Sequence, residues 1–366
     1  MKNPMLRPLS SKIPDYSIFA FDIETTGKTN DFLMGSIVGK DNKMVFWDKE
    51  EMINCLTNSR CFYKNARVFA TNLSFDITAL LQKTEQMKEL QILLRGSRII
   101  QARLPVKSHQ KRSNNVESYK DIIFLDTMNF YPFSVKAMGE ILKLPKLPMP
   151  DYIKEERMPR ENEKDGIEAY NLRDSEITYG FASFLQDSFK GMGCKMRMTA
   201  ASTALDLFKR RYLLAPMFQE SVEKMKDEYK AYYGGRTEVF QRGLIEDANY
   251  YDFNSLYPSV MRNEYPDISY SNCKEKGSLD VIMDYHGISE VQILCPKGLN
   301  IPFLPFRKDM KLIFPTGIFK GWYSHIELRY ALELGYQILN IGNQIYYTHC
   351  IIHSSDMPRI FMRSGN

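Results

Sequence analysis

Short hydrophobic runs, each closed by polar or turn-forming residues, alternate with amphipathic stretches over roughly the first half of the chain. Continuous apolar and β-branched residues predict buried strands at residues 17–21, 44–47 and 67–70. Apolar spacing typical of one helical face predicts helices at residues 49–56, 75–81 and 167–185. Strands that alternate with helices indicate an α/β layered fold. On the last helix one face is expected to carry Ile167, Tyr170, Asn171, Asp174, Ile177 and Thr178.

Proline and glycine mark where regular elements stop. Three prolines within residues 144–150 exclude a helix interior there. Gly191 and Gly193 mark the predicted domain boundary, after which residues 199–212 are expected to be helical. Residues 233–251 are predicted to mix strands with turns. Residues 267–353 are predicted to be mixed α/β, with their clearest helix at residues 322–334.

Length and composition narrow the class of protein. At about 150 residues per domain, 366 residues suggest two or three domains. Hydrophobic residues make up 44% and charged residues 25% of the chain, which is enough apolar material for a buried core. No apolar run approaches the ~20 residues that cross a bilayer. Membrane-spanning and disordered classes are therefore excluded.

The cysteines and the N-terminal residues indicate in which cellular compartment the protein is expected. No C-x-x-C spacing occurs, so free thiols in a reducing compartment are expected. No acidic residue precedes Asp15, which faintly resembles an organelle transit segment, although a short basic leader of this kind is more commonly just a tail. An intracellular protein of viral, plasmid-borne or mitochondrial origin is expected. The six cysteines are Cys55, Cys61, Cys194, Cys273, Cys295 and Cys350.

A net charge of +5 permits an anionic partner, and one stretch concentrates basic residues. Between Glu89 and Glu117 there is no acidic residue. Residues 99–106 and 118–125 are predicted to form a β-hairpin whose tip contains Ser113-Asn114-Asn115. The stretch is either a solvated loop or a phosphate-contacting one. Its basic residues are Arg95, Arg98, Arg103, Lys107, Lys111 and Arg112.

Four acidic residues lie in positions that predict a metal site. Asp22 and Glu24 end the first strand, where two carboxylates are costly unless a cation lies between them. Asp76 opens a helix after a strand, and Asp174 follows Tyr170 by four residues on one helical face. Four converging carboxylates can hold two divalent cations ~3.5–4 Å apart, as phosphodiester cleavage requires. Taken singly, Asp76 is also a plausible helix N-cap, Tyr170 a core residue and Asp174 a solvated acid.

The ordered combination of these residues resembles the three exonuclease motifs of family B DNA polymerases, which are DEDD-type 3′–5′ exonucleases. The D-x-E motif is matched by Asp22 and Glu24, the second motif by Asn72, Phe75 and Asp76, and Y-x-x-x-D by Tyr170 and Asp174. The resemblance implies a ribonuclease H-like domain, two Mg²⁺ or Mn²⁺ ions on the four carboxylates, and Tyr170 positioning the water.

The same resemblance assigns contacts with a single-stranded 3′ end. Thr25, Asn72 and Phe75 would hold that end, with Phe75 stacking on a base. In the protein-primed subgroup, Thr127, Met128 and Tyr152 match further strand contacts. That subgroup also has a lysine at the exonuclease site, for which Lys143 and Lys146 both remain candidates.

Residues 251–258 resemble motif A of family B polymerases, D-x-x-S-L-Y-P. A β-prone pair leads into Asp252, and the following turn suits a metal-bound triphosphate. The resemblance implies that Asp252 binds the catalytic metals, and that Phe253, Ser255 and Tyr257 contact the incoming nucleotide. Tyr232-Tyr233-Gly234-Gly235 resembles the Y-x-G-G motif, in which Tyr232, Gly234 and Gly235 would guide primer DNA between the two sites.

The printed sequence contains neither the fingers motif nor the D-T-D motif of that family. We therefore expect a fragment, a split subunit or a decayed product that does not synthesise DNA alone. The expected domains are an exonuclease at residues 1–190, the start of a polymerase palm at residues 191–262, and a protein-primed-type insertion with incomplete palm at residues 263–366. The implied partners are DNA as a single-stranded 3′ end or primer-template, dNTP, a terminal protein and a C-terminal polymerase polypeptide.

Two alternatives to a proofreading polymerase chain remain open. One is a free-standing 3′–5′ exonuclease acting on single-stranded DNA, and the other is a non-catalytic module that binds DNA or terminal protein. The cluster of His349, Cys350 and His353 is interpreted as structural, because no fourth metal ligand accompanies it.

Overall fold

The computed structural model describes residues 5–26, 30–107, 119–155, 157–213, 216–218, 220–309 and 311–351. The chain forms two compact units, Pro8–Leu213 and a second one made of Met1–Arg7 with Leu214–Asn366. No helix among the described residues is long and apolar enough to cross a membrane. All six cysteines are free thiols, as expected.

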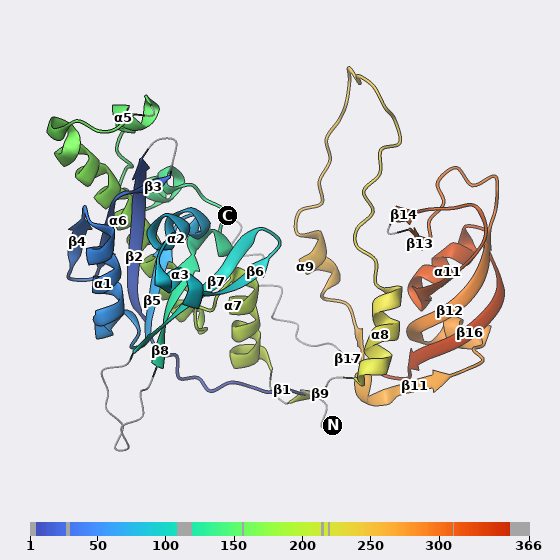
Figure 1. Ribbon diagram of the computed structural model, residues 1–366. Coiled ribbons are helices and arrows are strands. Elements are labelled where there is room, and N and C mark those ends of the chain that lie inside the picture. The colour runs from blue at the N-terminus through green and yellow to red at the C-terminus, as the bar shows by residue number, and fades with distance from the viewer. Residues whose placement is uncertain are drawn as a thin grey trace. The chain divides into compact units, whose positions relative to one another are not determined.

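A seven-stranded sheet organises the Pro8–Leu213 unit (Figure 1). β2, β5 and β8 run parallel at its centre, and the strands on either side are antiparallel to their neighbours. This mixed sheet, which is followed and covered by helices, confirms the predicted α/β class. In sheet order the strands are β4 (Lys43–Phe46), β3 (Asp31–Gly39), β2 (Ser17–Thr26), β5 (Ala66–Ala70), β8 (Tyr119–Asp126), β7 (Arg98–Lys107) and β6 (Gln91–Arg95).

Helices cover both faces of this sheet, and the alternation of side chains along β2 divides the core between them. Phe19, Phe21 and Ile23 pack with α1 (Lys49–Asn58) and α2 (Leu73–Leu81). Ile18 and Ala20 point to the other face and pack with α6 (Lys164–Met192). Shorter helices complete the unit: α3 (Glu85–Glu89), α4 (Val135–Ile141), α5 (Asp151–Lys154) and α7 (Ala200–Leu207).

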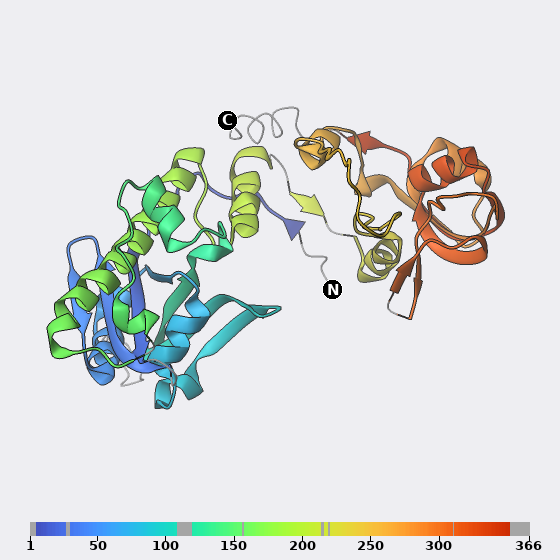
Figure 2. The same ribbon diagram turned by 90° about the horizontal axis from the view of Figure 1, so that it is seen from above.

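The predicted elements of this unit are present, and several are longer than expected. Helix α6 begins before and ends after residues 167–185, and the six residues predicted to share its inner face are all buried. Residues 144–150 contain no helix, as their prolines require. The predicted hairpin is formed by β7 and β8, whereas its tip lies outside the described residues. A second hairpin, β6–β7, extends from the edge of the sheet (Figure 2).

Gly193 ends α6 with φ 88°, yet the compact unit continues through α7 and a wider π turn to Leu213. Asp206 on α7 is buried and joins three segments of this region. Its carboxylate accepts hydrogen bonds from Lys195 N at 2.9 Å and Arg197 Nε at 2.7 Å, and pairs with Arg210. The assignment of functional domains to residues 1–190, 191–262 and 263–366 stays a prediction.

The second unit contains a four-stranded antiparallel sheet of order β11-β16-β12-β15. Helix α11 packs against it, and Ile293, Tyr323 and Leu328 lie in the core between them. The predicted mixed α/β character is confirmed, although α11 starts later than residue 322 because β15 extends to Ser324. The elements are β11 (Ser271–Lys274), α10 (Leu279–Asp284), β12 (His286–Cys295), β15 (Gly317–Ser324), α11 (His325–Glu333) and β16 (Gln337–Tyr347).

Short strand pairs and two further helices complete the second unit. β1 (Met5–Leu6) pairs with β9 (Met217–Phe218), β10 (Tyr265–Pro266) with β17 (Cys350–Ile351), and β13 (Phe306–Lys308) with β14 (Lys311–Ile313). The helices are α8 (Val222–Ala231) and α9 (Leu256–Val260). Cys350 lies in a strand, and the adjacent His349 ring lies 4.0 Å from that of Tyr270. His353 lies outside the described residues.

The long connection between α8 and α9 corrects one prediction (Figure 1). Residues 233–251 contain neither strand nor helix, because no neighbouring strand among the described residues pairs with them. Its root is held by Arg307, whose guanidinium donates to the carbonyls of Lys230 and Tyr232 and lies 4.3 Å from the centre of the Tyr233 ring.

Candidate active site

The alternation of β2 places two carboxylates opposite α6. Ile18 and Ala20 pack against the C-terminal half of α6, near Phe181 and Leu185. Asp22 and Glu24 occupy the next two positions on the same face, because side chains alternate along a strand. Asn171 of α6 confirms this facing arrangement, since its Nδ2 donates to Asp22 Oδ2 at 2.8 Å. The core packing of β2 therefore aims both acids at the N-terminal half of α6.

Asp76 reaches the same end of β2 from the opposite side. It lies in the first turns of α2, is buried, and its Oδ1 accepts a hydrogen bond from Ile23 N at 3.1 Å. The N-cap position of α2 belongs to Asn72, in the left-handed conformation with φ 69°, so Asp76 is not a helix cap. The backbone N–H between Asp22 and Glu24 thus positions Asp76 beside them.

Asp174 and Tyr170 lie on the inner face of α6, and a lysine joins them. The Nζ of Lys146 forms an ion pair with Asp174 Oδ2 and lies 4.5 Å from the centre of the Tyr170 ring. Lys143, the other candidate, is exposed. The irregular chain at residues 144–150, rich in proline, brings Lys146 to this face of α6. The structure therefore places Lys146, and not Lys143, in the carboxylate cluster.

The four carboxylates perturb one another strongly. Burial, followed by the charges of Asp76, Glu24 and Asp174, raises the pKa of Asp22 well above its usual range. Burial and then the charge of Asp174 raise the pKa of Glu24 to about 7, although Asn171 opposes the shift. Burial also raises the pKa of Asp76 and Asp174, while Lys146 opposes the shift at Asp174. The single ammonium group of Lys146 does not neutralise four carboxylates, so the ionised cluster would carry uncompensated negative charge.

This cluster fits divalent cations by charge and by donor type. Among the described residues, no three Asp, Glu, His or Cys side chains already form a set that encloses a metal ion. The buried Asp174 Oδ1, however, has no hydrogen-bond partner, and carboxylate oxygens are the donors that Mg²⁺ prefers. Asp22, Glu24, Asp76 and Asp174 are thus the residues that would hold such ions after side-chain adjustment.

A cavity at the start of α2 is lined by two of the residues predicted to hold a DNA end. Asn72 and Phe75 line a cavity of about 340 Å³ at the start of α2. The Phe75 side chain is 40% exposed, which leaves its ring open to a ligand. Ser74, Thr78 and Gln82 line the same cavity, and the sequence alone did not indicate them because no motif includes them. Thr25 lies on β2 directly after Glu24 and is half-buried.

Three other predicted strand contacts occupy different environments. Thr127 is fully buried, and its hydroxyl lies 3.0 Å from that of Thr71. Its contact with DNA stays a prediction. Tyr152 is 2% exposed, and its hydroxyl lies close enough to Glu24 to oppose the rise in the pKa of that carboxyl. Its contact with DNA stays a prediction. Met128 is half-buried, and its carbonyl accepts a hydrogen bond from Arg98.

Asp126 is a buried acid that the motifs did not indicate. Its Oδ2 accepts a hydrogen bond from Leu73 N at 3.0 Å, and its Oδ1 accepts from Asn72 N at 3.3 Å and Met128 N at 2.9 Å. These bonds hold the turn that presents Asn72 and Phe75. Burial raises the pKa of Asp126 despite the three N–H donors. The signal available in the sequence was its position directly after the apolar run at the end of β8.

The predicted polymerase residues all lie in the second unit. Asp252, Phe253 and Tyr257 are exposed, and Asp252 belongs to no strand, so the expected strand before it is absent. Ser255 precedes α9 in the left-handed conformation with φ 56°, which makes the predicted turn. Tyr232 is also exposed, and Gly235 lies near the Tyr257 hydroxyl, 3.7 Å from the position that a Cβ would take.

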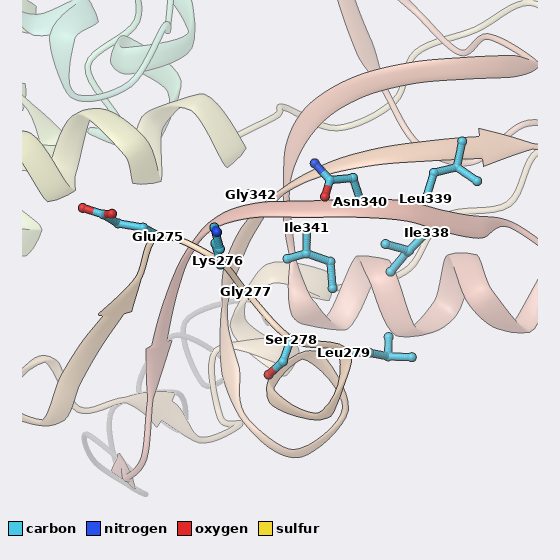
Figure 3. A pocket seen from close by; sticks show the side chains of 10 residues that line it. All are labelled: Glu275, Lys276, Gly277, Ser278, Leu279, Ile338, Leu339, Asn340, Ile341 and Gly342. Atoms are coloured by element: carbon cyan, nitrogen blue, oxygen red, sulfur yellow. The ribbon is translucent and has the colours of Figure 1, made fainter.

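A further cavity of about 580 Å³ in the second unit contains none of the predicted site residues. Its wall comes from residues 275–279 and residues 338–342, and includes one acid and one base. Figure 3 shows the Glu275 carboxylate pointing away from the other lining side chains. This cavity therefore lacks a set of converging polar groups that would indicate catalysis.

Comparison with known proteins identifies relatives of both units. The family model described as "DNA polymerase type B, organellar and viral" matches residues 145–352. A probable DNA polymerase of Neurospora intermedia is 30% identical over 185 residues, covering 47% of this chain and 19% of that protein. The DNA-directed DNA polymerase of Enterobacteria phage PRD1 is 32% identical over 141 residues, covering 38% of this chain and 23% of that protein.

A solved structure supports the fold. Phi29 DNA polymerase, complexed with primer-template DNA and incoming nucleotides, has a TM-score of 0.71 and 18% identity. The alignment covers 96% of this chain and 64% of that one, so this chain spans only part of the length of its relatives. Because the family model matches more than half of the sequence, the chain belongs to the type B DNA polymerases of organelles and viruses.

Proposed function

We propose that the Pro8–Leu213 unit is a metal-dependent 3′–5′ exonuclease that acts on single-stranded DNA within a protein-primed DNA polymerase. The observation that carries this proposal is the convergence of Asp22, Glu24, Asp76 and Asp174 at one end of β2, with raised pKa values throughout. Buried carboxylates with raised pKa values, grouped at one place, are typical of a functional site and would be stabilised in their charged forms by bound cations.

Each residue has a role that its contacts support. The four carboxylates would hold two Mg²⁺ or Mn²⁺ ions, which supply water activation and charge stabilisation at the phosphodiester. Lys146 holds Asp174 and covers one face of Tyr170, so it orients both groups. The Tyr170 hydroxyl would orient the attacking water. Asn171 fixes the rotamer of Asp22, and Phe75 offers an open ring on which a terminal base can stack.

The full chain, incubated with 5′-labelled single-stranded DNA and Mg²⁺, is expected to produce a ladder that shortens from the 3′ end. EDTA should stop the reaction, and a 3′-terminal phosphorothioate should slow it. A blocked 5′ end should have no effect. Release of nucleotides from the 5′ end, or degradation that continues in EDTA, would contradict the proposal.

Replacing Lys146 with methionine is expected to lower the rate of 3′-end hydrolysis about 10- to 100-fold, the usual effect of losing a group that supports metal ligands. The KM for DNA should change little, because Lys146 contacts Asp174 and Tyr170 and lines no part of the cavity beside Phe75. Lys143→Met is the matched control, since it removes the same group from an exposed position three residues away. Equal rates for the two variants would contradict the role given to Lys146.

The second unit is proposed to contribute the polymerase side of the protein. Asp252 would bind catalytic metal ions, and Phe253, Ser255 and Tyr257 would contact an incoming dNTP. Tyr232, Gly234 and Gly235 would contact primer DNA, and residues 263–366 would contact a terminal protein. These roles are supported by the family match over residues 145–352 and by the likeness to phi29 DNA polymerase, whose solved complex contains primer-template DNA and incoming nucleotides.

A further inference from the structure

A second cavity in the Pro8–Leu213 unit carries a concentration of positive charge. It has a volume of about 420 Å³ and is lined by Arg67, Arg103, Arg197 and Lys209. The one acid in its wall is Asp206, which already binds Arg197 and Arg210. Arg103 lies 3.9 Å from the Asp121 carboxylate, so Arg67 and Lys209 are the lining cations for which the described residues supply no ion pair.

Arg67 is the least compensated of these cations. It is half-buried beside the start of β5, and it forms no ion pair with the acids of the described residues. Its Nη1 donates to Ala66 O at 2.6 Å, and its guanidinium lies 3.9 Å from the centre of the Tyr16 ring. Burial, with the nearby charges of Arg103 and Arg197, lowers the pKa of Arg67, although Tyr16 opposes the shift. An anion in the cavity would relieve this repulsion.

Neighbouring contacts hold the cationic groups in place before any ligand arrives. Tyr16 also lies under Lys195, whose Nζ is 4.4 Å from the ring centre. The buried Gln101 accepts a hydrogen bond from Arg103 Nε at 2.9 Å and lines the cavity itself. Guanidinium groups fixed in this way match the geometry of phosphate oxygens.

The rest of the wall is suited to a base or sugar. Ile123, Met196, Met198 and Leu205 supply apolar surface, and the volume lies in the range of small-ligand pockets, ~300–1,000 Å³. The cavity is also separate from the carboxylate cluster. Tyr16 directly precedes β2, and Arg67 is the second residue of β5. Asp22 lies six residues after Tyr16, which is about 20 Å along the strand at ~3.3 Å per residue.

We propose that this cavity binds a nucleotide through its phosphate group, with Arg67 as the main phosphate ligand and Arg103 and Arg197 adding positive charge beside it. The phosphate could come from a free mononucleotide or from one nucleotide of a single strand, since both carry the same group. The site does not depend on the exonuclease proposed above, because none of its residues belongs to the carboxylate cluster.

The test uses the full chain in EDTA, so that metal-bound nucleotide does not contribute. Calorimetric titration with dAMP, deoxyadenosine and a single-stranded decamer is expected to show saturable binding of dAMP or of the decamer, and none of deoxyadenosine. Arg67→Gln should weaken that binding about 10- to 100-fold, the value of one or two charge-assisted hydrogen bonds. Binding should persist in the Asp22→Ala/Glu24→Ala variant, which separates this result from any failure of the exonuclease assay.

Two further variants separate the loss of a phosphate ligand from a general loss of positive charge or of folding. Arg60→Gln removes an exposed arginine of the same unit outside the cavity and should bind like the parent chain. Arg103→Gln, whose side chain is 49% exposed, should fold normally and also weaken binding. Without ligand, Arg67→Gln should melt at the same temperature as the parent or higher. Deoxyadenosine binding as tight as that of dAMP, unchanged affinity in Arg67→Gln, or no binding of either phosphate-bearing probe would overturn the proposal.

Discussion

Replacing Asp22 and Glu24 together with alanine is expected to lower the rate of 3′-end hydrolysis by about 10³-fold or more, because bound metal ions supply several kcal/mol of transition-state stabilisation. Both side chains leave β2 toward α6, and no other acid of β2 replaces them on that face. The measurement is single-turnover degradation of labelled single-stranded DNA with saturating Mg²⁺. Asp76 and Asp174 remain, so the variant tests the pair on β2 specifically.

The same variant should keep or gain thermal stability in EDTA. Burial, and after it the charges of neighbouring acids, raise the pKa of Asp22 and Glu24, so their charged forms cost folding free energy and replacing both residues removes that cost. Glu85→Ala, which removes an exposed acid from α3, is the control and should leave the rate unchanged. Undiminished hydrolysis by Asp22→Ala/Glu24→Ala would refute the site, whereas a lower melting temperature in EDTA would refute the electrostatic argument.

Asp206→Ala is expected to destabilise the Pro8–Leu213 unit by about 3–5 kcal/mol, the usual cost of leaving a buried charge without its partner. Asp206 is 2% exposed and binds Arg197, Arg210 and the backbone of Lys195. The side chain of Arg210 is 7% exposed, so its guanidinium would lose its counter-ion in a buried position. The predicted loss of folding free energy comes mainly from this buried guanidinium without a counter-ion.

The two tryptophans allow this loss to be measured in one unit alone. Trp47 lies in the Pro8–Leu213 unit and Trp322 in the other, so Trp322→Phe leaves a single reporter of the first unit. Urea unfolding followed by Trp47 fluorescence should show the shift, and adding Arg210→Met should recover part of it. Asp187→Ala, an exposed acid on α6, is the control. A shift no larger than that of the control would show that Asp206 is not essential to the packing.

The sequence predicted those parts of the site that depend on local periodicity. The period of two on β2 placed Asp22 and Glu24 on one face, and the helical period of α6 placed Tyr170, Asn171 and Asp174 on another. It did not predict that Thr127 and Tyr152 would be buried, because burial depends on which elements pack against a turn. The choice between Lys143 and Lys146 was likewise open, since both lie near residues 144–150, where no regular period fixes the direction of a side chain.

The second unit shows more clearly that a sequence motif does not determine the secondary structure around it. Motif A was recognisable residue by residue, yet the strand expected before Asp252 is absent. A strand needs a hydrogen-bonded neighbour, and β-propensity alone does not supply one. The residues of the cationic cavity gave no motif at all, because Tyr16, Arg67, Gln101 and Arg197 come together only through the packing of β2, β5, β7 and the segment before α7.

Strand β2 also restricts how this gene can change in length. The side chains that pack against α1 and α2 and those that face α6 come from the same ten residues. Inserting or deleting one codon between Phe19 and Asp22 would move every following side chain of the strand to the opposite face of the sheet. Asp22 and Glu24 would then point into the apolar core beside α1 and α2. Insertions and deletions in natural variants should therefore occur before Ser17 or after Thr26, whereas the strand itself should vary only by substitution.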